Sequence, residues 1–195
     1  MTLVSRRTAA LTLASLALAG RAGARPATVP IVDLPGPGGV FGVNGFDLFR
    51  GQAVAQRFAV PEDGDYGLAR VGFWLMNNSD TEQRWLRVQV RMDALDTGGG
   101  ESMPGGRIVE EWTTRVATVG WDPVEQYFRS ERRTRLQAGR DYWVVAGSRA
   151  QGGSDPIWLF ARSGNEIGSS NSGTGWTPGF PQGALTLRVD AFPPA

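Results

Sequence analysis

The sequence predicts an all-β fold, a two-sheet antiparallel β-sandwich of about eight strands with jelly-roll-like topology. Three observations predict it. The 195 residues include 27 glycines and 12 prolines, which favour many turns between short elements over long helices. The β-branched and aromatic residues gather in short runs, several of which alternate hydrophobic and polar positions. No run shows the period of an amphipathic helix. An immunoglobulin-like sandwich is the alternative.

The expected strands are separated by clusters of turn residues along most of the chain. They are the runs 54–60, 66–76, 83–94, 107–118, 124–131, 140–147, 156–162 and 184–192. Alternation is clearest in the third run, where every second residue from Leu86 to Met92 is hydrophobic. The intervening residues, from Trp85 to Arg91, are aromatic or polar, so one face of this strand is expected in the core and the other in water.

The second and third runs are expected to pair as an antiparallel hairpin, because the connection 77–82 is polar and turn-prone. Matching their hydrophobic faces pairs Phe73 with Leu86 and places Trp74 opposite Trp85. The sixth run is hydrophobic at nearly every position, which is typical of a central strand covered on both faces.

The first 51 residues do not follow the strand pattern. Residues 1–24 have the features of a signal peptide, since Arg6 and Arg7 precede an apolar run that ends in small residues. The arginine pair resembles the twin-arginine export signal, so that route and ordinary secretion both stay open. Residues 25–51 are expected to form an extended Pro/Gly-rich lead-in, and 52–195 a single β-sandwich domain. A leader of this kind predicts a secreted or periplasmic bacterial protein.

Composition excludes several classes of function. Cysteine and histidine are both absent, which removes disulfides, thiolate catalysis, Ser/His/Asp triads and metal sites built on Cys or His. The formal net charge is +1, and without the leader arginines it becomes slightly negative. Such a chain lacks the basic surface that nucleic acids and anionic membranes require. We therefore expect no nucleic-acid partner, no membrane span after leader removal and no enzymatic centre.

The candidate ligand-binding residues are aromatic side chains with polar neighbours. The predicted register places Trp74 and Trp85 side by side on an outer face, next to Arg87 and Gln89. Sugar rings stack on such aromatic faces, while their hydroxyls meet amide and guanidinium groups. Trp176 follows a long polar loop of the kind that often carries binding function. Alternatively, the tryptophans pack under the lead-in, form a stabilising cross-strand pair, or pin the loop to the sandwich.

Two groups of acidic residues bear on metal binding and catalysis. Asp93, Asp96 and Glu101 surround a glycine run, and calcium takes such oxygen ligands, although acids beside glycine are also ordinary turn residues. No cofactor is expected, with calcium at these acids as the one alternative. Glu110 and Glu111 are adjacent on an expected strand, so they point to opposite faces and cannot flank one glycosidic bond.

Five stretches in and next to the expected strands carry a family resemblance. They are Ala55–Val60, Tyr66–Leu75, Val88–Met92, Pro104–Val109 and Arg135–Val145. Together they resemble the choice-of-anchor R domains, which occur in secreted bacterial proteins that often end in a PEP-CTERM sorting tail. The resemblance implies a secreted or surface β-sandwich and carries over no catalytic residues. It does not extend to the sorting tail.

The expected function is surface recognition by a secreted, non-catalytic domain, with a polysaccharide or another envelope polymer as partner. A purely structural role in the envelope or matrix is the first alternative. An acid-pair glycoside hydrolase is the second, because that chemistry needs no histidine. Sequence alone leaves the ligand and the oligomeric state open.

Overall fold

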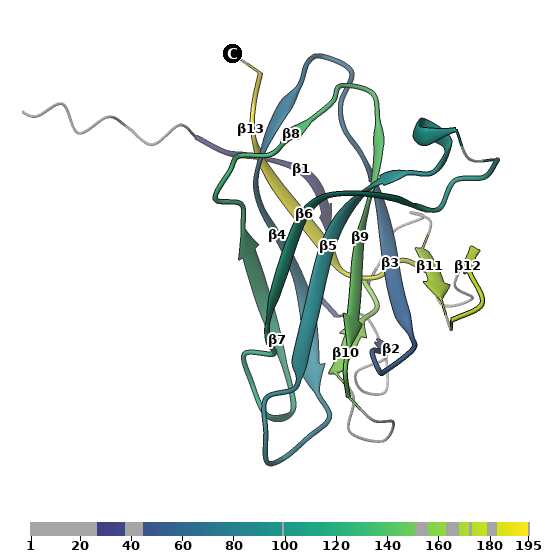
Figure 1. The fold of residues 1–195 in the computed structure, drawn as a ribbon. Coiled ribbons are helices and arrows are strands. Elements are labelled where there is room, and N and C mark those ends of the chain that lie inside the picture. Colours follow the sequence, from purple (N-terminus) through teal and green to yellow (C-terminus); the bar gives the residue numbers. More distant parts are fainter. Residues whose placement is uncertain are drawn as a thin grey trace, which may run out of the picture.

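The computed structural model describes residues 27–37, 45–98, 100–150, 156–162, 168–171, 173–178 and 183–194. In these parts the chain forms thirteen strands and one short 3-10 helix, with the strands in two antiparallel sheets (Figure 1). The predicted two-sheet sandwich is confirmed. Within the same ranges, no helix has the length and hydrophobicity needed to cross a membrane. The predicted signal peptide lies outside the described residues.

One sheet has seven strands and is built around the long strand β4. Its members are β1 (Val29–Leu34), β2 (Gly45–Asp47), β4 (Tyr66–Asn77), β7 (Gly120–Arg129), β8 (Arg135–Leu136), β10 (Pro156–Leu159) and β13 (Leu187–Phe192). Strands β7 and β13 both pair with residues 70–72, so they lie on opposite edges of β4. Strand β10 pairs with β4 on the β13 edge, beyond the end of β13.

The other sheet has six strands in the order β12-β11-β3-β9-β5-β6. They are β3 (Ala53–Ala59), β5 (Trp85–Asp93), β6 (Pro104–Arg115), β9 (Asp141–Ser148), β11 (Gly168–Asn171) and β12 (Trp176–Pro178). The 3-10 helix η1 (Leu95–Thr97) follows β5. Strand β9 lies between β3 and β5 and is buried over most of its length, as predicted for a central strand.

The main strand pairs are nested in the sequence. The first strand β1 pairs with the last strand β13, β3 with β9, β4 with β7, and β5 with β6. Successive pairs enter alternate sheets, as when one long antiparallel hairpin is rolled up. This is the jelly-roll arrangement, which confirms that prediction over the immunoglobulin-like alternative.

The core lies between the two sheets and is filled by the predicted hydrophobic faces. Val88 and Val90 of β5 are fully buried against residues such as Val71 and Phe73 of β4. The ring of Trp158 stacks on Phe73, with 4.3 Å between the ring centroids. The two-residue alternation therefore identifies which face of each strand is inward.

The predicted hairpin between β4 and β5 is wrong, because the two strands belong to different sheets. Trp74 consequently does not lie opposite Trp85. The alternation of hydrophobic and polar residues is the same for two strands that face each other across the core as for two strands paired in one sheet, so it could not distinguish the two arrangements. The turn after β4 is instead organised by the buried side chain of Asn77, whose amide donates to the carbonyls of Glu82 (2.6 Å) and Thr118 (2.9 Å).

The segment 25–51 is more than a lead-in to the domain. Its residues form β1, which pairs with β13, and β2, which pairs with β10. Ile31, Val32 and Leu34 pack on the core from the edge of the seven-stranded sheet. The sandwich therefore begins before residue 52. Proline and glycine around these short strands hid them in the sequence, and β8, β11 and β12 escaped prediction because each has only two to four residues.

Replacing Gln56 with leucine should destabilise the fold. Gln56 is fully buried on β3, and its Oε1 accepts a hydrogen bond from the Leu185 backbone N–H (2.8 Å). Gln56→Leu keeps the side-chain volume but leaves that buried donor without its acceptor, at a cost of about 1–3 kcal/mol. Urea denaturation measures the loss. Gln137→Leu, at an exposed position, is the control; equal stability of the two variants would contradict the expectation.

Candidate functional site

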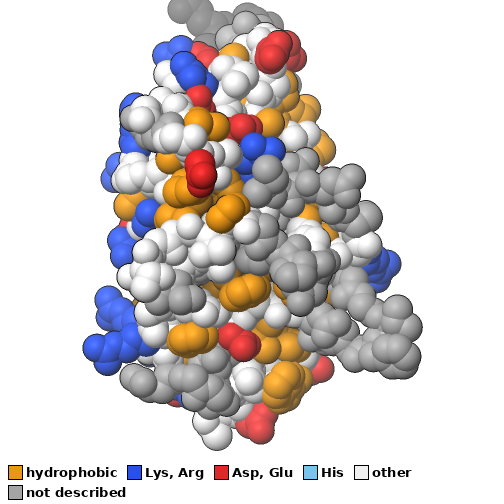
Figure 2. Space-filling model, turned by 90° about the vertical axis from the view of Figure 1, so that its right-hand side faces the viewer, with side chains coloured by type: hydrophobic (Ala, Val, Ile, Leu, Met, Phe, Trp, Pro, Cys, Tyr) orange, Lys and Arg blue, Asp and Glu red, His pale blue; other side chains and the backbone are white. Residues whose placement is uncertain are grey.

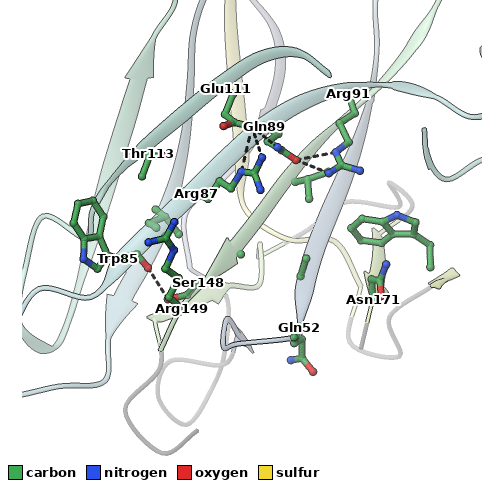
Figure 3. A pocket seen from close by; sticks show the side chains of 16 residues that line it. Gln52, Trp85, Arg87, Gln89, Arg91, Glu111, Thr113, Ser148, Arg149 and Asn171 are labelled. Atoms are coloured by element: carbon green, nitrogen blue, oxygen red, sulfur yellow. Dashed lines mark hydrogen bonds and ion pairs between the residues drawn. The ribbon is translucent and has the colours of Figure 1, made fainter. Parts of the chain in front are cut away.

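A groove of about 610 Å³ crosses the outer face of the six-stranded sheet (Figure 3). Outward-facing side chains of β3, β9, β5 and β6 form its floor and one side, and residues of β11 and β12 contribute the other side. Trp85 and Arg149 lie at one end of the view in Figure 3, and Asn171 lies at the opposite end. The groove is open to solvent along its length, so it can admit part of an extended molecule.

Strand register explains why the face is hollow there. One cross-strand row runs through Trp176, Asn171, Ala53, Gly147, Arg87 and Thr113. All six residues line the groove. Trp176 and Arg87 are four strand spacings apart, about 19 Å along the sheet. Between them lie Asn171, Ala53 and Gly147. Because Ala53 has only a methyl group and Gly147 only a hydrogen atom, the middle of the row is hollow.

A tryptophan stands at each end of the groove. Trp85 begins β5 and is 43% exposed, and the guanidinium of Arg115 lies 4.5 Å from the centroid of its ring. Arg115 lines a smaller neighbouring cavity instead of the groove, so Trp85 separates the two. Trp176 is half-buried and packs on a small outer cluster that includes Ala55 and Val145. Both rings are thus held by protein contacts and still border the groove.

Four polar side chains form a continuous hydrogen-bonded chain along one side of the groove. Arg87 donates through Nε (3.1 Å) and Nη2 (2.7 Å) to one carboxylate oxygen of Glu111, which also accepts from the Gln89 amide. Arg91 donates through Nε (2.9 Å) and Nη2 (2.6 Å) to Oε1 of Gln89. The bonds from Arg87 and Gln89 hold the pKa of Glu111 below its ordinary value, so its carboxylate is ionised at neutral pH.

The groove contains four of the five residues that the sequence singled out for ligand binding. Trp85, Arg87, Gln89 and Trp176 all line it, although the predicted register did not bring Trp176 near the others. Trp74 lies on the other sheet and takes no part. Its ring packs beside a buried cluster on that sheet, and a Cβ at Gly36 would be only 3.0 Å from its Nε1. Packing under the lead-in was one of the alternatives for this residue.

Sequence reasoning missed the residues that give the groove its shape and part of its charge. Gly147, Arg149 and Asn171 reach the groove only through the pairing of strands that are distant in the sequence. The available signal was the small outward residue Gly147 in a strand that is otherwise hydrophobic. Without knowledge of which strands pair with β9, the sequence does not show which residues lie beside that glycine.

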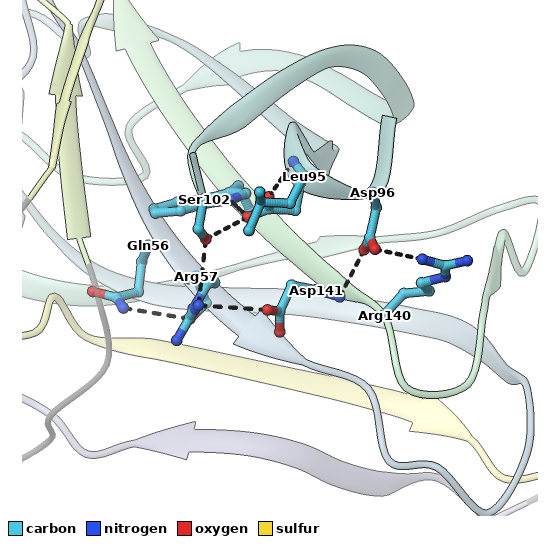
Figure 4. Close-up of polar contacts among 9 residues, drawn as sticks. Gln56, Arg57, Leu95, Asp96, Ser102, Arg140 and Asp141 are labelled. Atoms are coloured by element: carbon cyan, nitrogen blue, oxygen red, sulfur yellow. Dashed lines mark hydrogen bonds and ion pairs between the residues drawn. The ribbon is translucent and has the colours of Figure 1, made fainter. Parts of the chain in front are cut away.

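Two of the three predicted calcium ligands, Asp93 and Asp96, accept hydrogen bonds from other groups of the protein. The buried carboxylate of Asp93 accepts from Trp143 Nε1 (2.6 Å), Ser102 Oγ (2.7 Å) and the Leu95 backbone N–H (2.7 Å). Asp96 accepts from Arg140 Nη1 (2.5 Å) and from the backbone N–H of Asp141 (Figure 4). These bonds fix the loop that carries η1 onto β9.

Glu101 is exposed and does not join Asp93 and Asp96 in a ligand set. Across the described ranges, no group of three or more acidic residues is arranged to hold a metal ion. The calcium prediction therefore finds no support in the geometry. The reason is that protein donors already satisfy the oxygens of Asp93 and Asp96.

The adjacent acids Glu110 and Glu111 point to opposite faces of β6, as predicted. Glu111 joins the polar chain in the groove. Glu110 accepts from Ser130 Oγ (3.0 Å) and Thr134 Oγ1 in a neighbouring cleft of about 650 Å³ between β6 and β7, which Glu111 also lines. Glu111 is consequently the one carboxylate among the described residues that line the groove.

Comparison with known proteins adds no assignment. No protein-family model matches the sequence, and no curated protein matches it. The resemblance to choice-of-anchor R domains stays a prediction from the five sequence stretches.

Removing the Asp93 carboxylate should unfold the η1 loop and weaken the sandwich. Asp93→Ala leaves the buried indole N–H of Trp143 and two other donors without their acceptor, at a cost of about 3 kcal/mol. Glu101→Ala, on the same loop but exposed, should change stability by less than about 0.5 kcal/mol. Thermal and urea unfolding compare the two. A loss of similar size in both variants, or a melting temperature that chelator lowers, would argue against this account of the loop.

Proposed function

We propose that the protein is a secreted, non-catalytic recognition domain that binds a glycan chain in the groove of the six-stranded sheet. The proposal rests on the placement of two tryptophan rings, Trp85 and Trp176, at opposite ends of the groove, with a floor that includes small residues between them. Export is supported by the leader-like first 24 residues and by the resemblance to secreted domains.

The lining of the groove offers both kinds of contact that sugars need. The C–H faces of a sugar ring stack on an indole, and its hydroxyls exchange hydrogen bonds with amide, hydroxyl and guanidinium groups. Asn171, Thr113 and Gln52 supply such polar groups beside the tryptophans. The distance of about 19 Å across the groove row exceeds a single ring, so an oligosaccharide segment fits better than a monosaccharide.

The arrangement supports binding over hydrolysis. Glycoside hydrolysis uses two carboxyl groups about 5–9 Å apart on either side of the bond. Glu111 is the single carboxylate among the described lining residues, and Arg87 and Gln89 both donate to it. Ionised and hydrogen-bonded in this way, Glu111 serves as an anchor for the two side chains.

Loss of either groove tryptophan should weaken glycan binding. Trp85→Ala and Trp176→Ala each remove a stacking surface, and we expect the dissociation constant to rise about tenfold in each variant. Tryptophan fluorescence titration with oligosaccharides of plant and bacterial polymers measures the change. Trp121→Ala is the matched control, because Trp121 is 58% exposed and lies outside the groove.

Circular dichroism and thermal unfolding establish that each variant is folded before its affinity is compared. If the unaltered protein binds no glycan in such a panel, the purely structural role takes the place of this proposal. If Trp121→Ala weakens binding as much as Trp85→Ala, the ligand does not occupy the groove.

A side chain at Gly147 should block the groove without unfolding the sheet. A Cβ at this position would lie 3.7 Å from the Cβ of Ala53, an ordinary contact, and the backbone needs no positive φ. Valine favours strands, so Gly147→Val should keep the melting temperature or raise it. Its isopropyl group fills the floor, and we expect at least a tenfold loss of glycan affinity. Unchanged affinity in a folded Gly147→Val protein would place the ligand elsewhere.

A further inference from the structure

We infer that the groove selects acidic glycans, meaning chains that carry carboxylate or sulfate groups, over neutral ones. This inference rests on the proposed function and names the class of ligand for the same groove. Three arginines, Arg87, Arg91 and Arg149, line the groove together with the single acid Glu111. The described lining therefore has an excess of two positive charges.

The carboxylate of Glu111 accounts for only one of these arginines. Arg87 forms an ion pair with Glu111, in which Nη2 and the carboxylate oxygen are 2.7 Å apart. Arg91 donates to neutral acceptors, the Gln89 amide oxygen (2.6 Å) and the Gly105 carbonyl (3.5 Å). Arg149 is exposed and has no ion pair with any of the described residues.

The positive charge gathers in the groove and in the small cavity beside it. The chain as a whole has a formal net charge of only +1. Elsewhere on the surface, some arginines form ion pairs with aspartates: Arg135 with Asp65, and Arg140 with Asp96. On the side of the molecule shown in Figure 2, basic side chains gather along one border, while hydrophobic ones are interspersed with polar and acidic groups. In the neighbouring cleft between β6 and β7, by contrast, Arg129 and Arg132 lie beside three glutamates. Among the described residues, an excess of arginine over acid therefore distinguishes the groove and its adjoining cavity from that cleft.

Arg149 occupies the place where a ring substituent would be recognised. Arg149 and Trp85 both line the groove and both line the small cavity next to it. A sugar ring stacked on the free side of Trp85 would present its substituents to the Arg149 guanidinium. Guanidinium binds carboxylate and sulfate-like oxyanions through two parallel hydrogen bonds, which a neutral hydroxyl cannot offer.

The test compares three probes of similar length with the full mature protein. They are an oligogalacturonate, which carries carboxylates, a dextran sulfate oligomer, which carries sulfates, and a neutral β-glucan oligomer. Titration calorimetry should show tighter binding of at least one acidic probe than of the β-glucan. Arg149→Gln should weaken binding of that acidic probe about fivefold and binding of the β-glucan by less than twofold, because glutamine keeps hydrogen-bonding groups for hydroxyls but removes the charge. Arg132→Gln, which removes the same charge outside the groove, should have little effect.

A second variant tests the sign of the charge effect. Glu111→Gln keeps an oxygen that can accept from Arg87 but removes the one negative charge of the described lining. We expect it to bind the acidic probe about fivefold more tightly, because the excess positive charge grows. A variant that merely damages the groove would instead bind every probe less tightly.

The outcomes separate this inference from the proposed function. If the β-glucan binds as tightly as both acidic probes, or if Glu111→Gln weakens acidic binding, selectivity for acidic glycans is overturned while glycan binding stands. Equal losses in Arg149→Gln and Arg132→Gln would mean unspecific attraction and also overturn it. If no probe binds, the inference and the proposed function both fail. A preference for oligogalacturonate or for dextran sulfate supports the inference and identifies the acidic group.

Discussion

The inward packing of β9 against the opposite sheet is the constraint on which the groove depends. Tyr142, Val144 and Ala146 point into the core, so the residues between them must point outward. Those outward residues include Val145 and Gly147, and Gly147 has almost no side chain to offer. A shift of one residue in β9 would expose the core residues and fill the outer face, which burial of the sheet forbids. The core therefore fixes where the outer face is hollow.

The sequence predicted the fold class and the inward face of the strands correctly, but it did not predict which strands pair with one another. Alternation in β4 and β5 states which face of each strand is hydrophobic. It does not state whether two such strands pair edge to edge or oppose each other across the core. The jelly roll chooses the second arrangement, because β4 pairs with β7 and β5 with β6. The decision depends on nested long-range pairing, which no local pattern records.

The same distinction explains what could be predicted of the groove. The two-residue alternation along β5 is enough to place Trp85, Arg87 and Gln89 on the outer face, and the structure confirms that placement. Trp74 has the same phase on its own strand, yet it lies on the other sheet beneath Gly36. Arg149 follows β9 and enters the groove through the β5–β9 register. Composition and periodicity contain no information about that register, so they could not identify Arg149.

The position of the groove on an open sheet face decides how its contacts act. A bound chain would keep one side in water, so each contact contributes modestly, and binding depends on side chains that are already ordered. Arg115 holds Trp85, and Glu111 holds Arg87, before any ligand arrives. That order lowers the entropic cost of binding. If the proposed ligand is a polymer of repeating units, it would offer many equivalent segments to one groove, which raises the apparent affinity per chain without adding a contact. Such a shallow, pre-ordered face suits a repeating polymer better than a small soluble sugar.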